Sequence, residues 1–287
     1  MTSQIFDDRR CELGEGPLWH PLRQELFWFD ILGKRLLWRG EKGAGERSFD
    51  TYVSAAGWVD ENRLLIASAR ELFVHDLRDG SSETLCPLEA DNEVTRSNDG
   101  RADPWGGFWI GTMGVKSEEK AGAIYRFYKG ELRKIVPDVT ISNSICFSPD
   151  RALAYFTDTR AAQIMKVRLD AETGWFAGEP EVFLDARGEG WGIDGSVVDA
   201  KGNLWNAQWG ASRVSCYAPD GKLLASHPVA GLQASCPAFG GPDFSRLFVT
   251  TAATNIAPEV LAEEPGNGLT HVIEGAGQGL AEYQVIL

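Results

Sequence analysis

The sequence lacks the features of a membrane protein, a nucleic-acid-binding protein or a secreted protein. No run of about eighteen apolar residues occurs, so no segment is expected to span a bilayer. The formal net charge of −13 disfavours nucleic acid and anionic membranes as partners. The start, MTSQIFDDRR, lacks the apolar stretch of a signal peptide, which predicts a cytoplasmic location. No feature of the sequence indicates an obligate protein partner.

Cysteine and histidine are also scarce. The five cysteines are scattered and include no C-x-x-C pair, which predicts buried reduced thiols rather than disulfides or a zinc site. None of the four histidines has the context of a metal ligand, so neither a Ser-His-Asp nor a Cys-His catalytic centre is expected. The sequence has no P-loop and no G-x-G-x-x-G after a strand, so nucleotide chemistry has no support.

The sequence does contain an internal repeat. Short aromatic and β-branched segments, such as LFWFDILGKRLLWRG, GFWIGTM and LAYFTDTRAAQIMKVRL, recur between turns rich in Gly, Asp, Asn and Pro. Their spacing is close to the roughly 40 to 50 residues of a four-stranded propeller blade, and six such units fill the chain. We therefore predict an all-β fold, a six-bladed β-propeller with four-stranded blades, as a single domain over residues 1–287. Strands at 3–8 and 281–287 are expected to share one blade and so close the ring.

Aligning the repeats by their turns reveals six equivalent positions, each five residues before a turn such as Asp103-Pro104 or Ser148-Pro149. These positions are occupied by Glu15, Ala55, Asn98, Asn143, Asp194 and Cys236. If the strand before each turn is the innermost of its blade, all six side chains point into the central channel. Four of the six carry oxygen. The alternative is that such residues only begin turns or line a hydrated tunnel.

Oxygen-bearing side chains that converge in a closed channel are costly to bury unless a cation or a substrate compensates. Carboxylates and amide oxygens without histidine or cysteine form a hard ligand set, which suits Ca²⁺, Mg²⁺ or Mn²⁺. Arg96 lies two residues before Asn98, so in a strand both side chains share a face. Its guanidinium is expected to donate hydrogen bonds to a carbonyl or to a hydroxyl-rich substrate. The alternative is an exposed loop arginine.

Three nearby aspartates are expected to have structural roles. Strand alternation points Asp99 away from the ring, where it would cap a turn or brace the backbone of Asn98. Asp30 and Asp158 are expected to form hydrogen bonds that stabilise their blades.

Several segments resemble the regucalcin, or senescence-marker-protein/gluconolactonase, family of six-bladed propellers. The matching segments are LGEGPLWH, RSNDGRADPWGGFWIGTM, ISNSICFSPD, GIDGSVVDAKGNLWNAQW and CPAFGGPD, which together span nearly the whole chain. The resemblance implies a sugar-acid lactonase that depends on one divalent cation. It implies Glu15, Asn143 and Asp194 as metal ligands and Arg96 and Asn98 as substrate contacts. Ca²⁺ is the favoured cation, with Zn²⁺, Mg²⁺ and Mn²⁺ as alternatives.

The chain departs from the family pattern at two positions. Ser144 follows the expected ligand Asn143 where the family usually has glycine, which would narrow the channel without removing the ligand. Lys116 stands where some members carry an acidic contact to sugar hydroxyls. We therefore predict that Lys116 contacts the substrate and favours lactones that bear a distal carboxylate, the alternative being a solvated loop lysine beside Glu118 and Glu119.

The expected reaction is hydrolysis of an aldono- or aldarolactone to the sugar acid, as by a gluconolactonase. The cation would polarise the lactone carbonyl and Asp194 would act as general base on the attacking water. Arg96 and Asn98 would orient the ring. Two rival interpretations stay open: a phosphotriesterase or aryl-ester hydrolase, and a calcium-binding propeller without catalysis.

Overall fold

The computed structural model describes residues 3–287, and strands make up nearly all of their regular structure. Four sheets contain four antiparallel strands each. The first two sheets are β2 (Gly14–His20), β3 (Glu25–Asp30), β4 (Arg35–Gly40), β5 (Gly43–Ser48), and β6 (Val53–Asp60), β7 (Arg63–Ser68), β8 (Glu71–Asp76), β9 (Ser82–Pro87). The next two are β10 (Thr95–Ala102), β11 (Phe108–Gly114), β12 (Gly122–Tyr128), β13 (Glu131–Val139), and β14 (Ser142–Phe147), β15 (Leu153–Asp158), β16 (Gln163–Arg168), β17 (Glu181–Asp185).

The other eight strands form one larger sheet. Its first four strands are β18 (Gly192–Val198), β19 (Leu204–Trp209), β20 (Arg213–Tyr217) and β21 (Leu223–Pro228). Its other four are β22 (Gln233–Gly240), β23 (Arg246–Ala252), β24 (Thr270–Glu274) and β1 (Gln4–Asp7). Two short helices, η1 (Thr159–Ala161) and α1 (Pro258–Glu263), lie in connections between strands.

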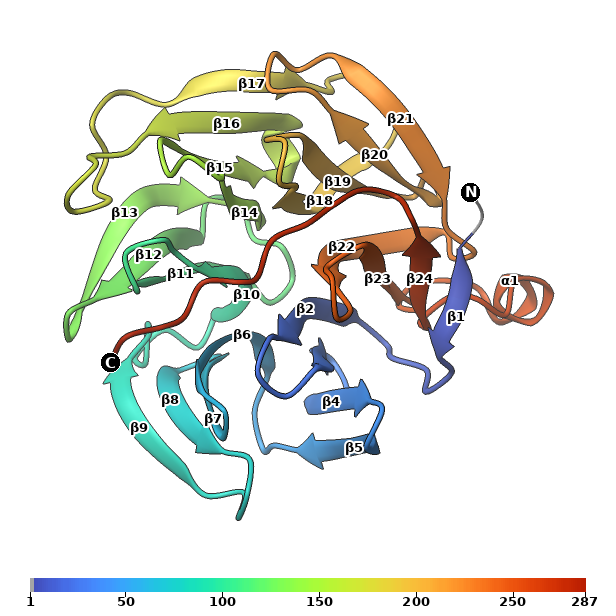
Figure 1. The fold of residues 1–287 in the computed structure, drawn as a ribbon, viewed down its shortest axis with the longest axis horizontal. Helices are drawn as coiled ribbons and strands as arrows, with labels where there is room; N and C mark the ends of the chain where they lie inside the picture. Colours follow the sequence, from blue (N-terminus) through green and yellow to red (C-terminus); the bar gives the residue numbers. More distant parts are fainter. Residues whose placement is uncertain (1–2) are drawn as a thin grey trace.

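The sheets are arranged around a common centre, with β2, β6, β10, β14, β18 and β22 nearest to it (Figure 1). The predicted all-β propeller with four-stranded blades is therefore confirmed. The sequence predicts six separate blades, whereas the hydrogen bonds between strands form four separate four-stranded sheets and one eight-stranded sheet. The cause is a backbone pairing between Trp209 of β19 and Gln233 of β22, which joins the two halves of the larger sheet.

The core lies between neighbouring sheets. All six residues of β3, ELFWFD, are buried, so this strand packs on both of its faces. Its Phe27 and Phe29 share a hydrophobic cluster with Leu64 and Ile66 of β7 in the next sheet. The outer strand β5 is mostly exposed. Burial on both faces of the middle strands thus fixes the sheets against each other and holds the inner strands around the axis.

Residues of the predicted N-terminal strand form β1, which pairs with β24 in an antiparallel manner and not with residues 281–287, so the predicted closure by strands from both ends is wrong. The expected strand at 281–287 is wrong. These residues form no strand and cross one end of the channel (Figure 1). Their hydrophobic character indicates a strand, but their backbone bonds go to separate sheets: Val285 N donates to Trp58 O (2.9 Å) and Ile286 N to Gly106 O (2.8 Å).

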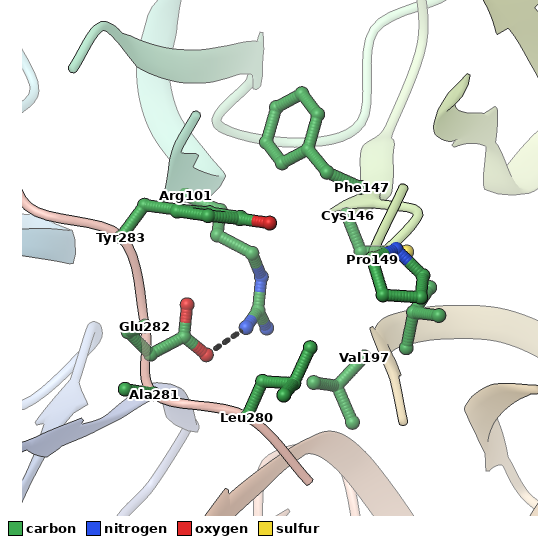
Figure 2. A pocket seen from close by; sticks show the side chains of 10 residues that line it. Arg101, Cys146, Phe147, Pro149, Val197, Leu280, Ala281, Glu282 and Tyr283 are labelled. Carbon is green, nitrogen blue, oxygen red and sulfur yellow. Dashed lines mark hydrogen bonds and ion pairs between the residues drawn. The ribbon is translucent and has the colours of Figure 1, made fainter. Parts of the chain in front are cut away.

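Residues 280–283 of the crossing segment line a small pocket at this end of the channel together with Arg101 of β10 (Figure 2). Glu282 of this segment forms an ion pair with Arg101, and the side chains of both residues are 9% exposed. Arg101 Nε also donates to Ile145 O (3.0 Å) and Nη2 to Ser196 O (3.1 Å). Only about 40 Å³ of space is left beside this pair. The larger cavity of the channel lies toward the opposite end, where the inner strands begin.

None of the helices in residues 3–287 combines the length and the apolar character needed to cross a bilayer. All five cysteines are free thiols, as predicted, and all except Cys86 are buried.

Candidate metal and substrate site

A cavity of about 620 Å³ occupies the open end of the channel. Five of the predicted site residues line it together: Glu15, Arg96, Asn98, Asn143 and Asp194. They come from the inner strands β2, β10, β14 and β18. Ala55 and Cys236 hold the equivalent positions on β6 and β22 and are buried outside the cavity lining.

A β-bulge or irregularity occurs at this level in every inner strand. The pairing register shifts between Glu15 and Leu18, Val53 and Ala55, Ser97 and Gly100, Asn143 and Cys146, Ile193 and Ser196, and Ala234 and Cys236. A bulge leaves a residue unpaired and redirects side chains. Gly16 and Ser144 adopt φ values of 54° and 59° at two of these bulges, in the left-handed region that favours glycine. The bulges therefore set which side chains face the cavity.

Three of the lining side chains are connected by hydrogen bonds. Arg96 Nη1 donates to Asn98 Oδ1 (2.8 Å), and Asn98 Nδ2 donates to Asn143 Oδ1 (3.0 Å). All three residues are at most 6% exposed. Arg96 Nε is buried and has no hydrogen-bond partner among residues 3–287. The guanidinium therefore is not fully hydrogen-bonded within these residues, and Arg96 is not the exposed loop arginine considered as the alternative.

Two carboxylates, Glu15 and Asp194, face the same cavity. Burial raises the pKa of Glu15, and the nearby Asp99 carboxylate raises it further. Burial and the Glu15 carboxylate raise the pKa of Asp194 well above its usual range. Within residues 3–287, neither acid forms an ion pair. Burial also lowers the pKa of Arg96 to about 10. Two buried acids without a paired cation are costly, and a cation bound between them would remove that cost.

The donor set fits a hard divalent cation. Glu15 and Asp194 supply carboxylates, and Asn143 supplies an amide oxygen from β14, which lies between β10 of Asn98 and β18 of Asp194. No group of three His, Cys, Asp or Glu side chains in residues 3–287 could hold a metal ion, so the set depends on its asparagine. No imidazole or thiol lines the cavity. Oxygen ligands alone favour Ca²⁺, Mg²⁺ or Mn²⁺.

The three aspartates with expected structural roles all bind backbone groups. Asp30 Oδ1 accepts from Leu13 N (3.0 Å), and Asp158 Oδ2 accepts from Thr140 N (2.8 Å), as predicted for these two. Asp99 differs from the prediction, because its Oδ2 accepts from Ile145 N (2.7 Å) on the inner strand of the next sheet. The bulge in β10 breaks the alternation on which its predicted direction depended. Burial raises the pKa of Asp99 to about 6.

Lys116 lies beside the cavity, outside its lining. Its side chain is exposed and borders an adjacent groove of about 430 Å³ together with Arg70 and Glu93. Its backbone N donates to Glu118 Oε2 (2.9 Å). A substrate would have to extend from the cavity into this groove to reach the Lys116 ammonium.

The sequence analysis missed several polar and aromatic residues of the lining. They are Thr159, Arg160, Trp209, Thr254 and Asn255. Thr159 and Arg160 belong to the FTDTR segment, which was interpreted only through its aspartate. All except Trp209 lie in connections after strands, where the repeat alignment assigns no equivalent positions.

The fold and the cavity together define a class: propeller proteins with an acid- and amide-lined site at one end of the channel. The chain belongs to the family described as SMP-30/Gluconolactonase/LRE-like region, whose sequence pattern matches residues 13–253. The predicted family is thereby confirmed.

Known proteins similar to this chain are found by sequence and by structure. A relative from Rhizobium meliloti (strain 1021), with the name of a sugar lactone lactonase, is 43% identical over 274 residues, which cover 94% of this chain and 92% of the relative. L-arabinolactonase of Azospirillum brasilense is 34% identical over 286 residues, or 96% of this chain and 93% of that protein. The crystal structure of a calcium-binding protein, regucalcin from Agrobacterium tumefaciens str. C58, matches with a TM-score of 0.98 and 40% identity. That match covers 100% of this chain and 98% of the other.

Proposed function

We propose that the protein hydrolyses a sugar lactone to the sugar acid and that this activity requires one divalent cation. The observation that carries the proposal is the convergence of Glu15, Asn143 and Asp194 from three inner strands on one cavity. The lactonase names of two relatives support the reaction, and the calcium-binding regucalcin supports Ca²⁺ as the favoured cation. Zn²⁺, Mg²⁺ and Mn²⁺ are the alternatives.

The ligands of this cation are Glu15, Asn143 and Asp194. A cation held there supplies Lewis acidity at the lactone carbonyl. Arg96 and Asn98 bind and orient the lactone ring, because both side chains line the cavity and can donate hydrogen bonds. Asp194 accepts the proton of the attacking water. The aldonic and aldaric lactones are the proposed substrate class, as for a gluconolactonase.

Two further features belong to the proposal. We infer that the eight-stranded sheet acts as two blades, since one residue pair joins its halves, and that the propeller is six-bladed. Lys116 contacts a distal carboxylate in those substrates that extend into its groove. A cytoplasmic location, and the absence of an obligate protein partner, stay predictions from the sequence.

A panel of aldono- and aldarolactones, read by acid release, tests the reaction. Wild-type turnover should exceed the spontaneous rate, fall to that rate in EDTA and return on addition of CaCl₂. An organophosphate or aryl ester hydrolysed faster than every lactone would favour the rival hydrolase. Calcium binding without turnover of any substrate would favour the non-catalytic propeller.

A further inference from the structure

A directed chain of hydrogen bonds runs along the wall of the cavity through residues of three inner strands and η1. Arg96 Nη1 donates to Asn98 Oδ1 (2.8 Å), and Asn98 Nδ2 donates to Asn143 Oδ1 (3.0 Å). Asn143 Nδ2 donates to Thr159 Oγ1 (2.9 Å), and Thr159 Oγ1 donates to Ile193 O (2.7 Å). The chain therefore ends on the residue before Asp194.

Both ends of this chain have a fixed direction. A guanidinium can only donate, and a backbone carbonyl can only accept. Each amide between them consequently has one favourable orientation. If the Asn143 amide were turned over, its NH₂ would face the NH₂ of Asn98, and two donors would oppose each other. Its oxygen would then face the Thr159 hydroxyl. If that hydroxyl donated to Asn143, it could no longer donate to Ile193 O. The orientation that satisfies every bond presents Asn143 Oδ1, a proposed cation ligand, toward Asn98.

We propose that Thr159 is a positioning residue of the cation site, an inference that rests on the proposed function. Its hydroxyl fixes the amide of Asn143 and is itself held by the backbone next to Asp194, so it connects two of the three ligands. Its own backbone is fixed as well, since Thr159 N donates to Ile141 O (2.9 Å). Partners of this kind, one step from the ligands, typically change metal affinity by roughly tenfold to a hundredfold when lost.

Two substitutions separate the hydroxyl from the methyl group of Thr159. Thr159→Val removes the hydroxyl at nearly constant volume, whereas Thr159→Ser retains the hydroxyl. Calorimetric titration of each metal-free protein with CaCl₂ should give a dissociation constant raised roughly tenfold to a hundredfold for Thr159→Val. Thr159→Ser should stay within about threefold of wild type. Melting in EDTA confirms that each variant is folded, and Thr159→Ala replaces Thr159→Val if the latter is not.

Wild-type affinity in Thr159→Val would overturn the inference. Equal weakening of the Ser and Val variants would overturn it too, because the methyl group rather than the hydroxyl would then matter. A wild-type protein that binds none of Ca²⁺, Mg²⁺, Mn²⁺ and Zn²⁺ contradicts the proposed function itself and removes the inference with it. That result is visible before any variant is compared.

A separate observation concerns the charge at the cavity mouth. The charged residues of the lining are the buried Glu15, Arg96 and Asp194 and the exposed Arg160. The Arg160 side chain forms no hydrogen bond and no ion pair within residues 3–287, although its backbone N donates to Asp158 Oδ1 (3.0 Å). η1 thus holds an unpaired cation on the cavity wall.

We further infer that Arg160 binds an anionic substituent of the substrate and makes the site prefer lactones with a carboxylate. This inference also rests on the proposed function. Unlike Lys116, whose groove contains Glu93 and Glu118, Arg160 belongs to the lining of the cavity. An exposed charge pair contributes modestly, so loss of the guanidinium should raise KM for an acidic lactone by roughly twofold to fivefold.

Kinetics of Arg160→Gln on glucaro-1,4-lactone and on glucono-1,5-lactone test this preference. KM should rise only for the acidic substrate, and the effect should shrink in high salt because the pair is screened. Arg168→Gln, an exposed arginine of β16 outside the cavity lining, is the matched control and should change neither KM. Equal changes on both lactones, or none, would overturn the inference. Failure of the wild type to hydrolyse either lactone would instead contradict the proposed function and the inference together.

Discussion

Ser144 donates a hydrogen bond from its Oγ to the backbone oxygen of Asp194, 2.5 Å away. The same hydroxyl lies 2.9 Å from Ser196 Oγ, and Ser144 is fully buried. Because Ser144 follows Asn143, this contact joins β14 to β18 directly beside two proposed ligands. Its φ of 59° is unfavourable for a residue with a side chain. The hydroxyl bond and the backbone strain therefore oppose each other at one residue.

Two substitutions of Ser144 should separate these contributions. Ser144→Ala loses the buried hydroxyl and keeps the strained backbone, so the free energy of unfolding should fall by about 1 kcal/mol or more. Ser144→Gly loses the same hydroxyl but relieves the left-handed strain, so it should be about 1 kcal/mol more stable than Ser144→Ala. Urea unfolding at fixed CaCl₂ measures both. Equal stability of the two variants would show that the strain is absent in solution.

Removal of the cation should lower thermal stability as well as activity. Without it, Glu15 and Asp194 remain two buried acids. Burial raises the pKa of both, the Asp99 carboxylate raises that of Glu15 further, and the Glu15 carboxylate raises that of Asp194 further. Binding to the native state alone stabilises by about 2.7 kcal/mol at a hundredfold excess over the dissociation constant. Melting curves across an EDTA and CaCl₂ titration should show this increase. A melting temperature independent of calcium would argue against calcium in the channel.

The repeat made much of this fold predictable. Six turns, four of them with proline, aligned six strands, and the residues five positions earlier lie on the inner strands, where Glu15 and Asn143 line the cavity. Local patterns could not predict the joining of β19 and β22, because a single backbone pair decides it. They also misassigned 281–287, whose backbone bonds to Trp58 and Gly106 instead of pairing along a sheet edge.

The ion pair between Glu282 and Arg101 should be important for stability. Removing one partner of a buried pair leaves an uncompensated charge, which typically costs about 3 to 5 kcal/mol. We expect Glu282→Ala to lose about 3 kcal/mol, because the pair is buried at the end of the channel that residues 281–287 cross. Glu263→Ala, on the exposed face of α1, is the control and should change stability by less than about 0.5 kcal/mol. A loss below about 1 kcal/mol in Glu282→Ala would mean that solvent screens the pair.

The site itself was predictable where it depends on strand positions and unpredictable where it depends on connections. Arg96 and Asn98 share a strand, so their common direction could be read from spacing. Strand alternation did not predict the partner of Asp99, because a bulge in β10 turns its side chain toward Ile145 N. Thr159 acts through hydrogen bonds between β14 and β18, a tertiary relationship that no single segment encodes.

Lys116→Ala should affect acidic lactones more than neutral ones if these substrates reach the neighbouring groove. The lysine is exposed, so the expected increase in KM is small, roughly twofold to fivefold. KM values for a matched pair of acidic and neutral lactones decide the matter. Identical changes on both, or no change, would assign Lys116 to the solvated surface.

Asp194 is the residue for which two roles are proposed, cation ligand and general base. Asp194→Asn keeps the shape and one oxygen of the side chain but removes a negative charge beside Glu15. Cation affinity should therefore fall. Turnover should fall further than the lost affinity explains, because general-base catalysis supplies a factor of roughly 10² to 10⁴.

The decisive measurement is the turnover of Asp194→Asn at a CaCl₂ concentration shown by titration to saturate the variant. Glu15→Gln is the matched control, since it removes the other carboxylate of the cavity without removing the proposed base. We expect saturating calcium to restore most of the rate in Glu15→Gln and to leave Asp194→Asn at least about a hundredfold below wild type. If both variants recover equally, Asp194 is a ligand only, and the proton of the attacking water goes to another group.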